Sequence, residues 1–272
     1  MTVGVARVSP GWLDQREAAD ATSRSRALVD ELRRHTAGGG WSIHDLGCGS
    51  GSMARWLAPL LAGSQHWFLH DRDPDLLALA EIDVPGPAAD GAEVAVETRL
   101  SDVTKLELED LSGATLITAS ALLDLLTRDE LGRLIQACTS AGCPVLFALS
   151  VTGRVQLLPA DPLDARIEHA FNAHQRRLTQ RGHLLGPDAV GTAIDSFERL
   201  GAEVVVRPSP WQLTGADGEL ASEWLNGWID AACEQEPALA PGGRTYRRRR
   251  LREAAIGALA VTVGHVDLLV LP

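Results

Sequence analysis

Ile43-His-Asp-Leu-Gly-Cys-Gly-Ser-Gly51 is the stretch of this chain that decides its fold. A short apolar run ends in Asp45, glycines follow at positions 47, 49 and 51, and an apolar helical pattern begins near Met53. Glycine has no Cβ, so its backbone can turn sharply and approach a ligand closely. A strand, a glycine loop and a helix in this order open a nucleotide-binding βαβ unit. The stretch therefore predicts an α/β fold with a nucleotide-like ligand at the loop.

The spacing of the glycines argues against a dinucleotide. The dinucleotide fingerprint is Gly-x-Gly-x-x-Gly, and counted from Gly47 its third glycine would fall at Ser52. Asp45 also stands two residues before Gly47, where its carboxylate would repel a diphosphate. A carboxylate in this place suits a cationic group, such as an ammonium or a sulfonium. A glycine-rich turn in an unrelated protein is the alternative for the loop alone, and the spacing disfavours an NAD-type oxidoreductase.

The composition limits the partners of the chain. Its 272 residues suit one large α/β domain or two small ones, and 45% of them are hydrophobic, which is enough for a substantial core. A nucleic-acid surface needs clustered lysine and arginine, so a net charge of −11 argues against DNA and disfavours RNA. The one basic cluster, Arg244–Arg252, is interpreted as a solvated helix face, with a local anion contact as the alternative.

The four cysteines form no Cys-x-x-Cys pair and no zinc spacing, so no metal is predicted. Reduced thiols favour a cytoplasmic protein. The first residues lack the basic and apolar regions of a signal peptide, and no uncharged apolar run is long enough to span a membrane. No membrane partner is therefore expected. The sequence does not specify an oligomeric state.

The hydrophobic pattern predicts alternating strands and helices. Strands are expected at 41–46, 66–69, 93–97, 114–119, 144–149, 204–206 and 261–270. Helices are expected over 10–35, from 53 onward, over 75–80 and 129–141, over most of 160–200, and over 217–236 and 244–258. The glycine run at 37–40 ends the first helix. This alternation predicts a twisted, mainly parallel sheet with helices on both faces.

Acidic residues follow three successive predicted strands. They are Asp45, Asp71 and Asp102, and the carboxyl ends of parallel strands are where an open α/β sheet binds its ligand. Asp71 is placed to accept hydrogen bonds from both hydroxyls of a ribose, and Asp102 from an adenine amino group. The alternatives are a surface acid for Asp71 and a turn-starting aspartate for Asp102. Together the three acids indicate a nucleoside that carries a cationic amino-acid group.

The pattern Asp-x-Gly-x-Gly-x-Gly at 45–51, followed by Asp71 and Asp102, resembles motif I and the next strand ends of the class I S-adenosylmethionine (SAM)-dependent methyltransferases. The resemblance covers roughly residues 40–150 with specific motifs, and the last third of the chain fits only in layout. It implies a Rossmann-like, doubly wound sheet of seven strands, the last one antiparallel and placed beside the fifth. It also implies SAM as the cofactor and S-adenosylhomocysteine as the product.

The same resemblance implies one domain with four parts. These are an N-terminal helical cap at 1–38, the SAM-binding core at 39–150, lid or substrate helices at 151–200, and strands six and seven with a helical insertion at 201–272. His265 lies in the last strand, where a buried, hydrogen-bonded histidine is expected.

The resemblance also implies which residues contact the cofactor. Asp45 faces the methionine ammonium, Arg72 lies beside the adenine edge, and Val103 packs on the ring. Small residues at the end of the fourth strand leave space for the transferred methyl group. The full set of expected cofactor contacts is Asp45, Gly47, Cys48, Gly49, Gly51, Asp71, Arg72, Asp102, Val103, Ala119 and Ser120.

Substrate and catalytic residues are expected outside the sheet. His174 is the candidate general base because an unperturbed histidine has a pKa of about 6.5, with a surface histidine as the alternative. Asp124, after the fourth strand, faces the substrate or caps a turn. Arg16, Asp20 and Arg24 share one helix face, as an ion-pair ladder or as a lid whose arginine meets a carboxylate. The expected substrate contacts are Trp12, Arg16, Arg24, Asn172 and Gln175.

The sequence thus predicts a SAM-dependent methyltransferase that acts on a small molecule by in-line displacement, with the acceptor atom open. An RNA or protein methyltransferase is the alternative, and it would need the basic residues 244–252 as a guiding face. A non-catalytic SAM-binding module is a third possibility. Residues 150–153 read Ser-Val-Thr-Gly, which lacks the ligands of the metal-dependent catechol-type enzymes.

Overall fold

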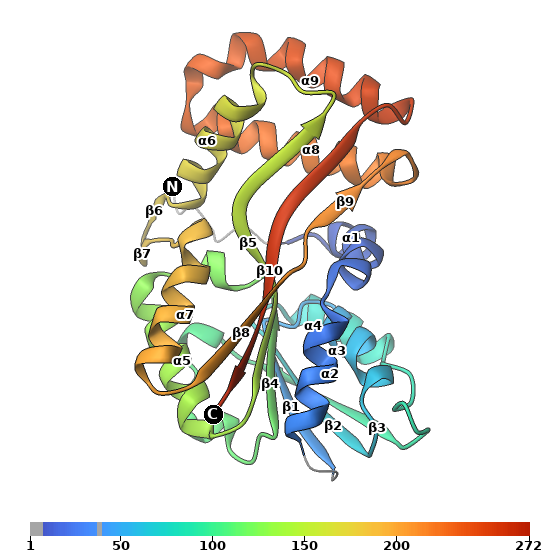
Figure 1. The fold of residues 1–272 in the computed structure, drawn as a ribbon, viewed down its shortest axis with the longest axis vertical. Coiled ribbons are helices and arrows are strands. Elements are labelled where there is room, and N and C mark those ends of the chain that lie inside the picture. The colour runs from blue at the N-terminus through green and yellow to red at the C-terminus, as the bar shows by residue number, and fades with distance from the viewer. Residues whose placement is uncertain (1–7, 37–39) are drawn as a thin grey trace.

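A computed structural model describes residues 8–36 and 40–272 of the chain. Its centre is an eight-stranded sheet with the order β3-β2-β1-β4-β5-β10-β8, in which β9 also pairs with β10 (Figure 1). The strands are β1 (Trp41–Leu46), β2 (Gln65–Asp71), β3 (Val94–Leu100), β4 (Leu116–Ser120), β5 (Val145–Leu158), β8 (Glu203–Pro208), β9 (Trp211–Leu213) and β10 (Ala260–Leu271). The first five strands pair in parallel, and β10 runs antiparallel to both of its main neighbours. The predicted Rossmann-like sheet is confirmed, and β9 is an addition.

Helices cover both faces of the sheet. In Figure 1, α5 and α7 lie on one face, α2, α3 and α4 lie on the other, and α6, α8 and α9 gather at one end of the molecule. Their bounds are α1 (Pro10–Ser23), α2 (Arg26–His35), α3 (Ser52–Leu57), α4 (Pro74–Ile82), α5 (Arg128–Ala141), α6 (Asp164–Gln175), α7 (Ala189–Arg199), α8 (Gly218–Gln235) and α9 (Ala240–Ala255). A short hairpin of β6 (Leu178–Thr179) and β7 (Gly182–His183) follows α6.

The helix expected over 10–35 is two helices. Ser25 begins α2 by accepting a hydrogen bond from the amide of Leu28, and its own amide donates to Asp267 of β10 over 2.7 Å. Asp267 also accepts from the amide of Leu149 in β5. A distant carboxylate therefore fixes the break between α1 and α2. Residues 37–39, part of the glycine run expected to end the first helix, lie outside the described residues.

The two longest strands extend the sheet beyond the end of β4. β5 was expected to end at residue 149, yet it pairs with β10 as far as Leu158. Above β4 the edge of β5 is open, and α6 covers it: Glu168 accepts from the amide of Val155 at 2.8 Å, and Asn172 donates to the carbonyl of Gly153 at 2.7 Å. Covering an edge in this way prevents pairing with another chain. The domain boundary expected after residue 150 falls within this strand.

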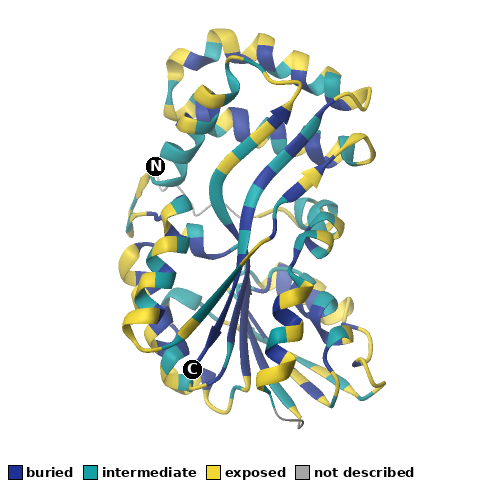
Figure 2. Cartoon of the chain, viewed as in Figure 1, coloured by how far each residue is buried: buried dark blue, intermediate teal, exposed yellow. Residues whose placement is uncertain are grey.

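The core has three parts that follow this architecture. One lies between the sheet and α5 and α7, and the second between the sheet and α2, α3 and α4. The third joins the upper halves of β5 and β10 to α8 and α9, with Trp228 and Tyr246 fully buried there. Figure 2 shows the central strands of the lower sheet as the most buried part of the chain, whereas β8 at the edge is intermediate or exposed. No helix within residues 8–36 and 40–272 combines the length and the apolar character needed to cross a membrane.

A buried histidine pair links the first three strands. Nδ1 of His44 in β1 lies 3.0 Å from Nε2 of His70 in β2, whose Nδ1 lies 3.1 Å from Oγ of Ser101. Burial lowers the pKa of each imidazole to about 4, so both rings are neutral at pH 7. In the unfolded chain each ring titrates near pH 6.5.

We expect the stability advantage of the wild type over a His70→Asn variant to shrink as the pH falls from 6.5 to 4. In that pH window the His70 ring binds a proton in the unfolded chain but not in the folded protein. The contribution of His70 to the free energy of unfolding is therefore present above pH 6.5 and is lost toward pH 4. The advantage should shrink by about 2 kcal/mol. Urea unfolding at pH 7.5, 5.5 and 4.5 measures it, and a pH-independent difference would contradict the assignment.

Candidate functional site

The glycine loop follows β1, whose neighbours in the sheet are β2 and β4. Gly47, Gly49 and Gly51 all have positive φ angles, of 68°, 56° and 88°. Side chains other than glycine rarely adopt this conformation, which explains the residue type at each position. The amide of Cys48 donates to the carbonyl of His70 at 2.9 Å, so the loop is tied to the end of β2.

Asp71 holds the loop from the end of β2. Its Oδ2 accepts from the amide of Gly49 and its Oδ1 from the amide of Asp73, both at 2.9 Å. The carboxylate therefore joins the glycine loop to the start of α4. Each carboxylate oxygen has a second lone pair, so Asp71 keeps acceptor capacity for the hydroxyls of a ribose.

Asp45 is a buried carboxylate with one unused oxygen. The residue is 1% exposed, and its Oδ1 accepts from Oγ1 of Thr118 in β4 at 2.7 Å. Its Oδ2 is buried and receives no hydrogen bond from any described residue. Burial raises the pKa of Asp45 to about 7, against the opposing effects of Thr118 and of the Arg24 charge. Such a group gains most when a cation binds beside it.

Arg24 is the basic counterpart of Asp45. It lies between α1 and α2, is 3% exposed, and donates from Nη2 to Oγ of both Ser52 and Ser120 at 3.1 Å. Its Nε is buried and unpartnered within the described part of the chain. Asp45 and Arg24 thus place an unused acceptor and an unused donor of opposite charge beside the glycine loop. This arrangement suits a zwitterionic amino-acid group.

The N-terminal helix α1 covers the loop. A Cβ built on Gly49 would lie 3.1 Å from Cδ1 of Leu13, so the helix packs directly on the loop backbone. Glu17 accepts from Nε and Nη2 of Arg55 in α3 at 2.8 and 2.5 Å, which fixes α1 to the helix that follows the loop. A ligand at the loop is therefore covered by α1.

Asp20 of α1 is buried. The residues Arg16, Asp20 and Arg24 are therefore not a solvent-exposed ladder of ion pairs. Asp20 is 4% exposed, accepts from Nε of Arg16 at 2.9 Å, and also accepts from Nε1 of Trp211 in β9 at 2.9 Å. The Arg16 guanidinium lies 5.0 Å from the Trp211 ring centre, and Trp12 packs at 6.2 Å from the same ring. Trp211 lies in β9, a strand that the hydrophobic pattern of the chain does not predict.

His265 completes this cluster from β10. It is 5% exposed, its ring lies 5.5 Å from that of Trp211, and its Nδ1 has no partner among the described residues. Burial, followed by the Arg16 charge, lowers its pKa to about 3. The expected burial of His265 is confirmed, and its ring hydrogen-bonds with the backbone of Val263 while Nδ1 stays unpartnered among the described residues.

The end of β4 leads to Asp124. Ala119 and Ser120 are followed by Ala121, whose φ of 51° is unusual for a residue other than glycine and is typical of strained functional sites. Asp124 lies in the 3₁₀ turn Leu123–Leu125, and burial raises its pKa to about 6, against the opposing charges of Arg16 and Arg177. The charges of Arg16 in α1 and of Arg177 after α6 therefore act on this carboxyl group, although neither arginine forms an ion pair with it among the described residues.

The end of β3 places Asp102 at a turn. Its Oδ1 accepts from the amide and hydroxyl of Thr104 at 3.1 and 2.7 Å, and Lys105 lies 3.5 Å from its Oδ2. Partial burial acts to raise the pKa of Asp102, but these two partners hold it below its usual value. The carboxylate thus starts the turn that contains Val103. Arg72, next to Asp71, is exposed.

The candidates on α6 lie in a separate set of contacts. Nε2 of His174 lies 3.3 Å from Oε2 of Glu234 in α8, and burial, followed by the Arg177 charge, lowers its pKa. Asn172 and Gln175 each keep a buried side-chain oxygen that no described residue hydrogen-bonds. No hydrogen bond or ion pair within the described residues joins these three side chains to Asp45 or Arg24. Residues 8–36 and 40–272 contain no cluster of three metal-ligating side chains.

Comparisons with known proteins agree with this geometry. Residues 43–143 match a family model described as a methyltransferase domain. No curated protein matches the chain in sequence. The cyclopropane synthase MmaA2 from Mycobacterium tuberculosis is a similar solved structure, with 14% identity, a TM-score of 0.45, and coverage of 90% of this chain and 83% of that one. Coclaurine N-methyltransferase bound to N-methylheliamine and S-adenosylhomocysteine has 16% identity, a TM-score of 0.44, and coverage of 97% and 75%. The family match covers less than half of the chain, and it shows that the segment with the glycine loop and the ends of β1 to β4 is similar to a methyltransferase domain.

Proposed function

We propose that the chain transfers a methyl group from SAM to a small-molecule acceptor. The observation that carries the proposal is the buried pair of Asp45 and Arg24 beside the glycine loop. The unused Oδ2 of Asp45 fits the α-ammonium of the cofactor, and the unused Nε of Arg24 fits its α-carboxylate. Asp71 has lone pairs left for the ribose hydroxyls. When bound, SAM supplies a methyl group on a sulfonium that is already activated for displacement.

Positioning is the main contribution of the protein to this reaction. Holding two reactants in line is worth on the order of 7–11 kcal/mol in favourable cases. The small side chains of Ala119 and Ser120 leave space at the end of β4, and α1 excludes water from the loop below it. Asp102 and Val103 receive the adenine in this proposal, and Arg72 lies at its edge.

We assign the acceptor side of the site to Asp124. At pH 7 a carboxyl group with a pKa of about 6 is mostly ionised, so it can take a proton from a hydroxyl or an amine. His174 is a less favourable base because its contact is with Glu234 of α8, and no hydrogen bond or ion pair among the described residues joins it to Asp45 or Arg24. Arg16 and Trp12 line the side of the site formed by α1, and Asn172 and Gln175 offer polar oxygens from α6. The net charge of −11 supports a small acceptor over a nucleic acid.

The cellular location is part of the same proposal. Cys48, Cys138, Cys143 and Cys233 are all free in the structure, which suits a reducing compartment. This observation favours the cytoplasm.

We expect SAM and S-adenosylhomocysteine, and not NAD, to bind the purified protein. Asp71→Ala should weaken SAM binding about tenfold, because a charged hydrogen-bond acceptor for the ribose is lost. Asp195→Ala, an exposed aspartate on α7, is the matched control and should leave the affinity unchanged. Isothermal titration calorimetry gives each dissociation constant. Binding of NAD in place of SAM would refute the proposal.

A transfer assay distinguishes an enzyme from a binding module. SAM with a tritiated methyl group is incubated with the protein and with separate pools of phenols, amines, thiols, RNA and protein. We expect label in a small-molecule pool. Label confined to RNA or protein would support the alternative substrate classes, and SAM binding without transfer to any pool would support a non-catalytic module.

A further inference from the structure

The arginines of α9 point in different directions around the helix, so some of them form ion pairs with other described residues and others do not. Arg250 is 1% exposed and donates from Nη2 to both oxygens of Asp164, at 2.7 and 2.8 Å. Arg249 pairs with Asp161. The interpretation of the whole run as a solvated face is therefore wrong for Arg250, whose burial between α9 and α6 requires this bidentate partner.

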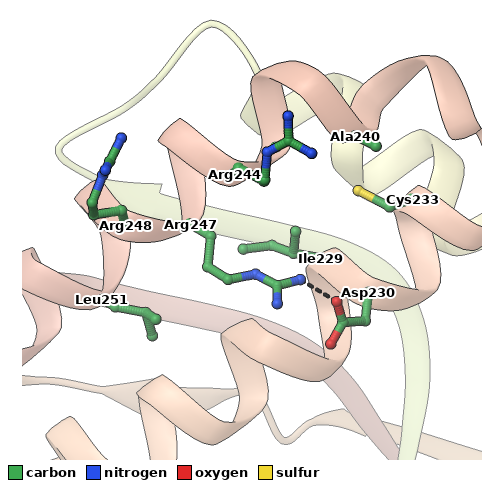
Figure 3. A pocket seen from close by; sticks show the side chains of 9 residues that line it. Ile229, Asp230, Cys233, Ala240, Arg244, Arg247, Arg248 and Leu251 are labelled. Carbon is green, nitrogen blue, oxygen red and sulfur yellow. Dashed lines mark hydrogen bonds and ion pairs between the residues drawn. The ribbon is translucent and has the colours of Figure 1, made fainter.

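Three other arginines of α9 face a groove between α8 and α9 (Figure 3). Arg247 pairs with Asp230 of α8. Arg244 and Arg248 form no hydrogen bond or ion pair with any of the described residues, and they are four residues apart, so their like charges repel on one helix face. The groove thus carries three positive charges against one negative charge, in a chain whose net charge is −11.

The groove itself has the size and lining of a small-ligand site. Its volume is about 480 Å³, and pockets for small molecules measure roughly 300–1,000 Å³. Ile229 and Cys233 of α8 and Leu251 of α9 contribute apolar lining, and Ala240 leaves room at one end. Figure 3 shows Arg247 beside Ile229 and directed at Asp230, with Arg244 and Arg248 at the edge of the groove. The site therefore combines a cationic rim with an apolar floor.

A second groove on the protein also combines arginines with apolar residues, here Ile135 and Leu200, but its arginines differ in their contacts. It lies between α5 and α7, has a volume of about 380 Å³, and is lined by Arg128 and Arg199. Arg199 already donates to the carbonyl of Asp195 and to Oγ of Ser196. Arg128 acts on the carboxylate of Asp188, whose pKa it helps to lower. Arg199 of the α5–α7 groove is thus held by contacts within the protein, so among the described residues this groove offers one free arginine where the α8–α9 groove offers two, and it serves as the comparison site.

We propose that the α8–α9 groove binds a small organic anion with an apolar body, such as a medium-chain carboxylate. The anionic end lies between Arg244 and Arg248 and relieves their mutual repulsion, and the apolar body lies on Ile229 and Leu251. The groove is at the end of the molecule formed by α8 and α9, away from strands β1 to β4 (Figure 1). It is therefore a site distinct from the glycine loop, and it does not depend on the proposed methyl transfer.

Calorimetry with decanoate tests the proposal. We expect the wild type to bind decanoate more tightly than decanol or inorganic phosphate, because the site needs both an anion and an apolar body. The double variant Arg244→Gln/Arg248→Gln should bind about tenfold more weakly, since charged hydrogen bonds are lost. The matched variant Arg128→Gln/Arg199→Gln should bind as the wild type does. Equal binding of decanol or of phosphate, or an equal loss in both double variants, would overturn the proposal.

Alkylation of Cys233 gives a second measurement that uses only the wild type. Cys233 is half-buried in the groove, whereas Cys48, Cys138 and Cys143 are buried. Saturating decanoate should slow the reaction of Cys233 with iodoacetamide, followed by mass spectrometry, at least threefold. An unchanged rate at saturation would overturn the proposed location even if decanoate binds elsewhere.

Discussion

Asp45→Asn should weaken SAM binding about a hundredfold, because it removes a buried charge that pairs with the cofactor ammonium. Asparagine keeps the shape of the side chain and an oxygen that accepts from Thr118. In the wild type, affinity should fall as the pH decreases from 8 to 6, because protonation of a carboxyl with a pKa of about 7 removes the same charge. Over this range the variant should lose this pH dependence. Calorimetry at pH 6, 7 and 8 measures both effects.

The stability of the same variant should change in the opposite direction. The pKa of Asp45 is raised in the folded state, so its contribution to stability is present below the unfolded value near 4 and is lost as the pH rises through 7. Without cofactor at pH 8, Asp45→Asn should therefore melt no lower than the wild type. Asp195→Asn is the control for both measurements. A variant that binds SAM within threefold of the wild type would contradict the role assigned to Asp45.

Asp124→Asn should lower kcat for methyl transfer by roughly a hundredfold or more, since a general base contributes about 10²–10⁴-fold. Its affinity for SAM should stay within twofold of the wild type, because the proposal places Asp124 on the acceptor side and not at the cofactor. The wild-type kcat/KM should decrease below pH 6, where Asp124 becomes protonated. The measurement uses the acceptor that takes up label in the transfer assay.

His174→Ala is the comparison that decides between the two candidate bases. Its pairing with Glu234 predicts a change in kcat of less than about threefold. A large decrease in kcat in His174→Ala, with little change in Asp124→Asn, would identify His174 of α6 as the general base. It would also contradict the assignment of Asp124 to the acceptor side.

Much of the cofactor site could be predicted because its parts are local in sequence. Gly47, Gly49 and Gly51 adopt positive φ angles, which residues other than glycine rarely adopt. The residue type at these positions therefore predicts the backbone conformation of the loop. Asp45 and Asp71 follow apolar strands, and parallel pairing brings the ends of those strands together. The helices on both faces follow from the alternation of strands and helices, whereas the antiparallel β10 was expected only from the resemblance to the methyltransferases.

The environment of α1 could not be predicted in the same way. Arg16, Asp20 and Arg24 have the spacing of an ion-pair ladder, and only the contact of Asp20 with Trp211 shows that the acid is buried. That contact joins residues 191 positions apart in the sequence. It depends on β9, a strand of three residues that is too short to produce a hydrophobic pattern.

The sequence alone determined the fold class, the glycine loop and the acids at the strand ends, because each depends on short-range pattern and on the parallel sheet that such patterns form. The tertiary structure decided which of these groups keep an unused polar atom. Among residues 8–36 and 40–272, burial leaves Oδ2 of Asp45 and Nε of Arg24 without partners, and it divides the arginines of α9 between the core and a groove. Hydrogen-bond satisfaction and burial depend on residues far apart in the chain, so only the folded arrangement specifies them.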